Sequence, residues 1–308
     1  MSKKKTNKKR LGWLLGLLIV GLIALLPSLN IAGVPTWDAL FTSAGLRTGR
    51  TDGYPLRVHF LDVGQGDSAL IQSGDMNVLI DGGESGNEER VIKYLRNQNV
   101  KQLDYVIATH PDSDHIGALA KIMAGYPPKN VIIPKMTEKN MKTTKTYTNF
   151  LVAVKDSGAK AIYAKPGTEY KLGEAKLTIL APLDDYADAN DMSIVCRVSY
   201  GKVAYLFTGD AEGKSEADLL KSGRNLRADV LKVGHHGSKS STSKAFLAAV
   251  APSVAVISCG QDNSYGHPHA DTLKKLGDAG AKVYRTDQLG WIVLATDGEE
   301  LVREWEKE

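Results

Sequence analysis

The stretch "THPDSDHIG" (residues 109–117) carries two histidines and two aspartates within six positions, directly after an apolar run. Pro111 disfavours the helical conformation for His110, so we expect the chain to leave a strand in extended form before a helix follows. Capping of that helix by Ser113 or Asp114 would account for one aspartate only. The remaining polar side chains therefore need a different explanation.

Metal binding explains this cluster better than a polar turn, because His110, Asp112 and His115 have no role in a helix cap. Imidazole and carboxylate together suit Zn²⁺, Mn²⁺ or Fe, whereas Ca²⁺ prefers oxygen alone. Four ligands so close in sequence can hardly all reach one tetrahedral ion, and a pair of ions about 3.5–4 Å apart accommodates them better. Such a pair requires further ligands, including a carboxylate that bridges.

Candidates for these further ligands follow two apolar stretches downstream. Asp210 ends "YLFTGD", and His235 and His236 follow "VLKVG". Polar residues at the end of a strand lie where loops build sites. An aspartate after glycine is common in turns and indicates little alone, whereas a double histidine in this position favours metal binding or catalysis.

The charge of the chain is concentrated at its N-terminus. The net charge is +4, and without the six basic residues near the start the remainder carries −2. Those six are Lys3, Lys4, Lys5, Lys8, Lys9 and Arg10. The body therefore has no global basic signature for nucleic acid, although a local basic groove stays possible.

The N-terminal pattern predicts a segment that directs the chain to the membrane. Residues 1–10 form a basic cytoplasmic segment, and the apolar residues 11–29 are roughly long enough to span a bilayer, which needs about 20. We interpret them as a signal anchor, with a cleaved signal peptide as the alternative. Residues 30–54 form a linker and residues 55–308 the body. The body would be extracytoplasmic and membrane-anchored, or secreted.

The body reads as hairpins, then strand–helix alternation, and then both again. This order predicts an α+β fold with two mixed sheets facing each other and helices outside. The two cysteines, Cys196 and Cys259, lie in apolar strand-like runs, which favours buried free thiols over a disulfide. The segment at 135–148 is rich in lysine and threonine and predicts a solvated loop, whose lysines would alternatively meet an anionic substrate.

A set of motifs, taken in their order along the chain, resembles that of a known family. They are "HFLDVGQGDSALI", "LIDGG", "THPDSDHIG", "NDMSIV", "FTGD", "VGHHGS" and "NSYGHPH". Together they resemble the metallo-β-lactamase-fold hydrolases, and more narrowly the hydrolase domain of ComEC-type competence proteins, over about residues 56–300. The resemblance implies an αββα sandwich with two divalent metal ions, Zn or Mn, at one edge.

The resemblance also implies residue roles. The implied metal ligands are His110, Asp112, Asp114, His115, Asp210 and His235. The first two hold one ion and the next two the other, while Asp210 bridges. His235 and His236 are not separated by the motif, and the one that is not a ligand would contact a phosphate or a leaving group. Asp81 of "LIDGG" would steady a ligand by hydrogen bonding.

Two departures from the commonest pattern of the superfamily concern the first metal site. Asp112 stands where that pattern has a middle histidine, and a further histidine ahead of the bridging aspartate is absent. Asn190, Asp191 or Ser193 in "DANDMSIVC" would stand in for it. ComEC-like sequences resemble this chain in both respects. An oxygen-rich first site favours Mn²⁺ and makes β-lactam chemistry less expected.

Two other polar residues fall within turns that we expect near the same edge. Asp67 in "FLDVGQGDS" is interpreted as fixing a tight turn, because the stretch lacks the spacing of a phosphate-binding loop. His267 in "NSYGHPH" is our choice for a substrate-facing residue. The predicted catalytic residues are therefore Asp114, His236 and His267, acting with the metal ligands.

The hypothesis for function is hydrolysis of a phosphodiester or another anionic substrate, DNA among them. A hydroxide between the two ions would attack phosphorus, oriented by Asp114 or Asp210, and His236 or His267 would assist the departing oxygen. One alternative is another hydrolase of the same fold, acting on phosphorylcholine or cell-wall esters, lactones or β-lactams. A second is a non-catalytic surface binding module. The membrane is a predicted partner through the anchor, and no protein partner is predicted.

Overall fold

The computed structural model describes residue 51 and residues 53–306. They belong to one compact unit, Thr51–Glu308. The predicted basic segment and anchor, and nearly all of the predicted linker, lie outside the described residues. Within residues 53–306, no helix combines the length and the apolar character that a membrane crossing needs.

The first sheet has eight strands in the order β15-β14-β1-β2-β3-β4-β5-β6. Strands β3 to β6 run parallel to one another, whereas the strands from β15 to β3 pair antiparallel. The strands are β1 (Leu56–Phe60), β2 (Ala69–Ser73), β3 (Met76–Ile80), β4 (Tyr105–Ile107), β5 (Asn130–Ile133), β6 (Lys160–Tyr163), β14 (Trp291–Thr296) and β15 (Leu301–Glu306).

The second sheet has seven strands in the order β13-β12-β11-β10-β9-β8-β7. Strands β10 to β13 are parallel, and β7 to β10 pair antiparallel. The strands are β7 (Glu169–Leu172), β8 (Ala175–Ala181), β9 (Val195–Tyr200), β10 (Val203–Phe207), β11 (Val230–Lys232), β12 (Val254–Ile257) and β13 (Lys282–Arg285).

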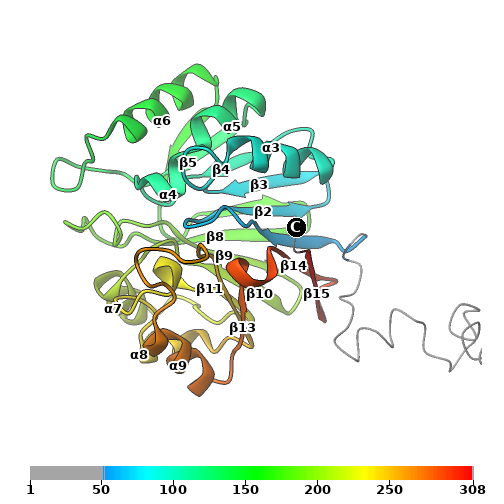
Figure 1. Cartoon of the computed structure of the whole chain (residues 1–308), viewed down its shortest axis with the longest axis vertical. Helices are drawn as coiled ribbons and strands as arrows, with labels where there is room; N and C mark the ends of the chain where they lie inside the picture. The colour runs from blue at the N-terminus through cyan, green and yellow to red at the C-terminus, as the bar shows by residue number, and fades with distance from the viewer. Residues whose placement is uncertain (1–50, 52, 307–308) are drawn as a thin grey trace, which may run out of the picture. The chain divides into compact units, whose positions relative to one another are not determined.

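Helices cover the outer face of each sheet. Those beside the first sheet are α3 (Glu88–Asn97), α4 (Ser113–Ile116), α5 (Leu119–Gly125) and α6 (Lys145–Asp156). Those beside the second are α7 (Gly213–Lys221), α8 (Lys244–Val250) and α9 (Ala270–Asp278), while α10 (Thr286–Leu289) joins β13 to β14. Figure 1 shows α3, α5 and α6 on one side of the strands and α7, α8 and α9 on the other.

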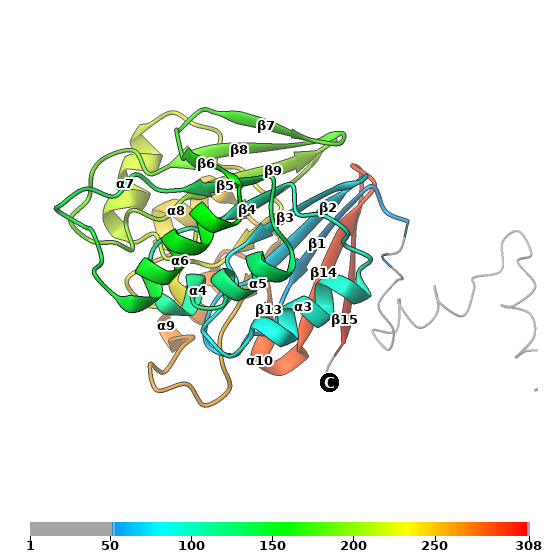
Figure 2. The same ribbon diagram turned by 90° about the horizontal axis from the view of Figure 1, so that it is seen from above.

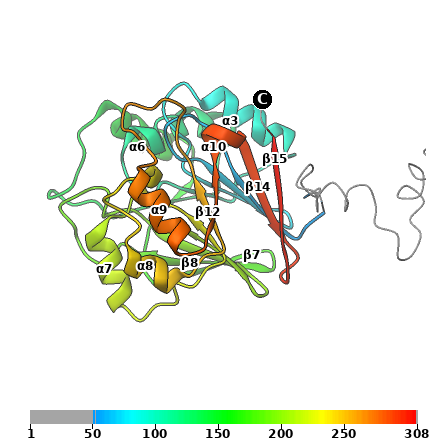
Figure 3. The ribbon, with the colours of Figure 1, turned by 60° about the horizontal axis from the view of Figure 1, so that its bottom comes forward.

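Alternation along the strands builds three apolar layers. In β1, Leu56, Val58 and Phe60 face the space between the sheets, because successive side chains of a strand point to opposite faces. In β10, Tyr205 and Phe207 face the same space, and Leu206 packs beneath the helices of the second sheet. The two sheets with their helices form the expected αββα sandwich, seen from above in Figure 2 and with α9 forward in Figure 3.

The two cysteines follow this layering. Cys196 lies between the sheets and Cys259 lies beneath the helices of the second sheet. Both are buried and free, in agreement with the sequence expectation.

Candidate metal centre

One edge of the sandwich collects the polar residues of the motifs. Asp81 follows β3, His110 follows β4, Asp210 follows β10, and His235 follows β11. Because the carboxyl ends of parallel strands meet at the same edge of a sheet, residues far apart in the chain gather there. The facing edges of the two sheets together form the site.

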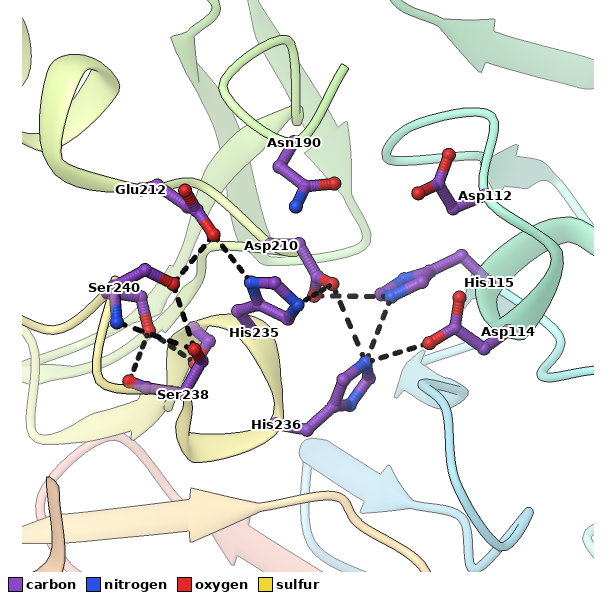
Figure 4. Close-up of polar contacts among 12 residues, drawn as sticks. Asp112, Asp114, His115, Asn190, Asp210, Glu212, His235, His236, Ser238 and Ser240 are labelled. Carbon is purple, nitrogen blue, oxygen red and sulfur yellow. Dashed lines mark hydrogen bonds and ion pairs between the residues drawn. The ribbon is translucent and has the colours of Figure 1, made fainter. Parts of the chain in front are cut away.

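The carboxylate of Asp210 is the centre of this edge. Its Oδ1 lies 3.2 Å from Nε2 of His115, and its Oδ2 lies 3.5 Å from Nε2 of His236. Nε2 of His235 is 3.6 Å and Nε2 of His110 is 3.9 Å from Oδ2. Four imidazole nitrogens therefore converge on one carboxylate that is 3% exposed. Figure 4 shows three of the four around it.

In each of these histidines the other ring nitrogen, Nδ1, contacts a neighbouring polar group. Nδ1 of His110 lies 3.1 Å from Oγ1 of Thr109. Nδ1 of His115 lies 2.8 Å from Asp81, the aspartate expected to steady a ligand. Such contacts fix the ring orientation and leave Nε2 directed at the centre of the site.

His235 and His236 are presented by a turn in which both residues have left-handed backbone angles, with φ of 47° and 52°. Non-glycine residues seldom adopt this region, and such strain occurs where the surrounding structure fixes it. Nδ1 of His235 lies 2.7 Å from Glu212, and Nδ1 of His236 lies 3.0 Å from the carbonyl oxygen of Ser258. The turn therefore aims both Nε2 atoms at Asp210.

The two histidines differ in burial and in neighbours. The side chain of His235 is 24% exposed, whereas that of His236 is 1% exposed. Nε2 of His236 also lies 3.1 Å from Oδ2 of Asp114. The sequence did not separate these two histidines, and the structure brings both of them to Asp210.

Charge pairing dominates the protonation of the site. Burial opposes charge on His115, yet Asp210 and Asp81 raise its pKa well above the ordinary value. Burial also opposes charge on His236, and Asp210 with Asp67 raises its pKa to about 10. Burial would raise the pKa of Asp210, but His115 and His236 hold it well below the usual range. The negative charge of the buried carboxylates is therefore balanced by positive charge on protonated histidines.

A bound metal ion would supply the same positive charge. Asp67, His115, Asp210 and His236 each offer a ligand atom, and these atoms lie within 4.8 Å of one another. Nε2 of His110 is buried and makes no hydrogen bond within residues 53–306. Buried polar atoms without partners are rare unless a further group binds them. Imidazole and carboxylate donors are the ligands that divalent transition metals take.

Four ligands expected from the sequence are not members of this cluster of four. Two of them, His110 and His235, still direct Nε2 at Asp210, and the other two are Asp112 and Asp114. The side chain of Asp112 is 33% exposed at the mouth of the site, where Oδ1 lies 3.2 Å from Nζ of Lys142. Asp114 lies closer, beside His236. In Figure 4 the carboxylate of Asp112 stands apart from the carboxylate of Asp210.

The three expected substitutes for the absent histidine have separate positions. Oγ of Ser193 accepts a hydrogen bond of 3.0 Å from the backbone N–H of Asp210 and so supports the central residue. Oδ1 of Asp191 accepts from the N–H groups of Glu212 and Ser215, at the start of α7. Asn190 lies near the carboxylate of Glu212, where its amide helps to lower the pKa of that group.

His267, predicted from the sequence to face the substrate, lies beside the histidine pair. Its ring centroid is 5.5 Å from that of His235, and its Nδ1 is buried without a hydrogen-bond partner among the described residues. Burial, with the charges of His236 and His235, lowers its pKa to about 4. A neutral His267 can donate or accept one hydrogen bond at the mouth of the site.

Comparison with known proteins places this geometry in a family. Residues 61–261 match the family described as the metallo-beta-lactamase superfamily. The chain belongs to the metallo-β-lactamase superfamily. The αββα layers and the polar residues at one edge agree with this assignment.

Two curated relatives of this superfamily member each match more than two thirds of its length. ComE operon protein 3 of Bacillus subtilis is 34% identical over 254 residues, which are 76% of this chain and 32% of the relative. Recombination protein 2 of Haemophilus influenzae is 34% identical over 226 residues, covering 71% and 26%. The chain therefore spans about a third of the length of the relatives that it matches.

A solved structure shares the fold. CmlA, a diiron β-hydroxylase from Streptomyces venezuelae, superposes with a TM-score of 0.55 at 12% identity, covering 79% of this chain and 54% of that one. The family, the curated relatives and the Asp/His cluster support a metal-dependent hydrolase related to competence proteins.

Three residues of this metallo-β-lactamase-fold site were not found from the sequence: Glu212, Lys232 and Thr109. Glu212 contacts His235, Thr109 contacts Asp81 and His110, and Lys232 contacts Asp67. The sequence could have indicated these three residues only through their position within or close to the quoted motifs. Asp67 was interpreted as fixing a turn, and it also lies within the cluster of four.

Proposed function

We propose that this chain is a divalent-metal-dependent phosphodiesterase with a dinuclear centre. The observation that carries the proposal is the convergence of four imidazole nitrogens on the buried carboxylate of Asp210. A carboxylate at the centre of four such donors suits a bridging position between two ions. Asp112 and Asp114 would add oxygen ligands from the mouth of the site.

The chemistry follows from this arrangement. Divalent ions bound there would lower the pKa of a coordinated water and neutralise charge on a phosphoryl oxygen. Asp114 would orient the attacking water, because its Oδ2 already lies beside His236. His267 would face the departing oxygen from the other lip and hold a hydrogen bond to it.

Anionic substrate recognition would use the lips of the site. Lys142, 40% exposed and paired with Asp112, offers a cation where a non-bridging phosphate oxygen would lie. On the opposite lip Tyr265 is 64% exposed and stacks beside His267 at 5.6 Å. A cation and an exposed ring suit a phosphodiester joined to a flat base. Together with a relative that is named as a recombination protein, this favours nucleic acid, DNA in particular.

The location of the activity is part of the proposal. An apolar stretch at residues 11–29 behind a basic segment supports a membrane anchor with the catalytic domain on the extracytoplasmic side, or secretion after cleavage. Its partners would be the membrane and the anionic substrate, with no dedicated protein partner.

A substrate screen with defined metals tests this function. Purified full chain, stripped with chelator and reloaded with Mn²⁺ or Zn²⁺, is assayed on bis-p-nitrophenyl phosphate, single-stranded and duplex DNA, and nitrocefin. We expect diester turnover that needs metal and is lost in Asp114→Ala. Turnover of nitrocefin or an ester without any diester turnover would instead place the chain among the other hydrolases of its fold.

The non-catalytic alternative has its own readout in the same samples. Metal content measured by mass spectrometry should approach two ions per chain at saturation. A protein that retains no metal at any ratio, yet binds DNA or wall polymer, would be a binding module and would overturn the proposal.

A further inference from the structure

A buried lysine lies directly behind the metal edge and has no part in the proposed chemistry. Lys232, the last residue of β11, is 4% exposed. Its Nζ lies 2.8 Å from Oδ2 of Asp67 and donates to the carbonyl oxygen of Val233 at 2.9 Å. Burying an ammonium group is costly unless it is paired and hydrogen-bonded. A methionine of similar length would fill an interior position without that cost, so the charge calls for an explanation.

The partner of this lysine connects it to the histidine turn. The other oxygen of Asp67, Oδ1, lies 3.2 Å from Nδ1 of His236, which also faces the carbonyl oxygen of Ser258. Nε2 on the far side of the same ring faces Asp210 and Asp114. A continuous line of contacts therefore runs from Lys232 through Asp67 and His236 to the centre of the site.

The residues along this line of contacts are buried and closely packed. Asp67 is 6% exposed, and its backbone N–H donates to the carbonyl oxygen of Asp114 at 3.1 Å. The cavity beside Asp67 and Lys232 holds about 10 Å³, at the lower limit for a single water. The space beside the carboxylate is therefore too small for more than a single water.

We propose that Lys232 is a positioning residue for the metal centre, holding Asp67 against Nδ1 of His236 so that Nε2 of this ring points at the metal. Without the lysine, the buried Asp67 carboxylate would lose its compensating cation and turn from His236. The inference rests on the proposed metal centre and adds a residue that fixes its donor set.

The sign of the effect separates positioning from simple charge. A lysine near two cations repels them, so if Lys232 acted only by its charge, its removal would tighten metal binding. If it positions His236, removal weakens metal binding, by about 10-fold to 100-fold as for other groups that orient ligands. The two explanations predict opposite changes.

The experiment compares Lys232→Met with Lys129→Met in the full chain. Lys129 pairs with Asp104 at 2.7 Å, and its side chain is 60% exposed, so this variant removes a lysine–aspartate pair away from the metal edge without emptying a buried position. Zn²⁺ and Mn²⁺ affinities are measured by calorimetry, and the visible spectrum is recorded with Co²⁺. We expect weaker binding and an altered Co²⁺ spectrum in Lys232→Met alone. Unchanged or tighter binding with an unchanged spectrum overturns the proposal.

A second variant covers the case in which Lys232→Met does not fold. Asp67→Asn keeps the shape of the side chain, and the double variant tests whether the lysine acts through Asp67. We expect Asp67→Asn to weaken metal binding and the double variant to match it. Fully additive losses would show that Lys232 acts by another route and overturn the proposal.

Nitrogen NMR of the metal-free protein separates this inference from the proposed function. The Nδ1–H signal of His236, identified by its absence in His236→Gln, should shift in Lys232→Met and not in Lys129→Met. If the wild-type chain bound no metal, the proposed function would fail, while the NMR result would still decide whether Lys232 positions His236. An unshifted signal would overturn the positioning role.

Discussion

Oε1 of Glu212 lies 2.7 Å from Nδ1 of His235 and accepts a hydrogen bond from Oγ of Ser240. The carboxylate therefore sits behind a histidine whose Nε2 faces Asp210, as Figure 4 shows. This pairing makes Glu212 a candidate positioning residue for His235, although none of the quoted motifs contains it.

We expect Glu212→Gln to weaken metal binding or catalysis by about 10-fold or more, because the charge that orients His235 is lost. Metal affinity by calorimetry and diester turnover measure the effect. Glu169→Gln, which removes an exposed partner of Lys176, is the control and should behave as wild type. Equal affinities and rates in both variants would contradict the role of Glu212.

Asp210→Asn should abolish the stabilisation that metal gives to the fold. A ligand at about 100 times its dissociation constant stabilises by about 2.7 kcal/mol, so metal should raise the melting temperature of the wild type by several degrees. Chelation should reverse that rise, and the variant should show neither change. Thermal unfolding with and without Zn²⁺ or Mn²⁺ measures it, and an equal metal-induced rise in both proteins would refute the central position of Asp210.

Gly66 allows a close backbone approach that shapes the site. A Cβ at this position would lie 2.3 Å from the carbonyl oxygen of Asp114, so Gly66→Ala must displace the backbone of a catalytic residue. Gly64 also has a positive φ, but a Cβ there would meet nothing within 4 Å. We expect Gly66→Ala to lose at least tenfold more diester activity than Gly64→Ala, and equal losses would show that backbone strain alone acts.

His59 gives the fold a specific acid sensitivity. Burial, with the charge of Arg57, lowers its pKa to about 3, so the folded state disfavours the protonated ring. Its stability contribution is complete above the unfolded pKa near 6.5 and is lost as pH falls towards the folded pKa, at about 1.4 kcal/mol per pH unit. Denaturant unfolding between pH 7 and pH 4 should show His59→Phe losing less stability than wild type. Parallel pH profiles would contradict this.

Lys142→Ala should raise the KM for a diester about fivefold with little change in kcat, because an exposed phosphate contact contributes about 1 kcal/mol. The difference from wild type should shrink at high salt, where exposed charges are screened. Lys155→Ala, on the same surface but without a contact to Asp112, is the control. A KM unchanged by Lys142→Ala at low salt would remove this lysine from substrate binding.

Most of the fold could be predicted because its strands are marked by local pattern. The runs that became β1, β3 and β10 are apolar enough to be identified one by one. Two strands were missed, β7 and β15, because "EYKL" and "LVREWE" are rich in charged residues at the ends of their sheets. The helix at the metal motif begins at Ser113, earlier than the sequence indicated.

The candidate site divides in the same way. The spacing of His110, Asp112, Asp114 and His115 made them candidates, and the resemblance to the family implied the bridging role of Asp210. No local pattern separated His235 from His236 or indicated Glu212 and Lys232. Asp114 and His236 are 122 positions apart, and no local pattern relates residues at that distance.

The sequence alone determined most of the strands and the positions at which polar residues follow them, since periodicity and turn chemistry are local properties. Only the tertiary structure decided which Nδ1 atom faces which carboxylate, and therefore which Nε2 atoms reach Asp210. That outcome depends on the parallel pairing of β10 with β11 and of β3 with β4, and on the packing of two sheets that meet at one edge. Contacts between separate strands fix it, and a linear pattern does not record such contacts.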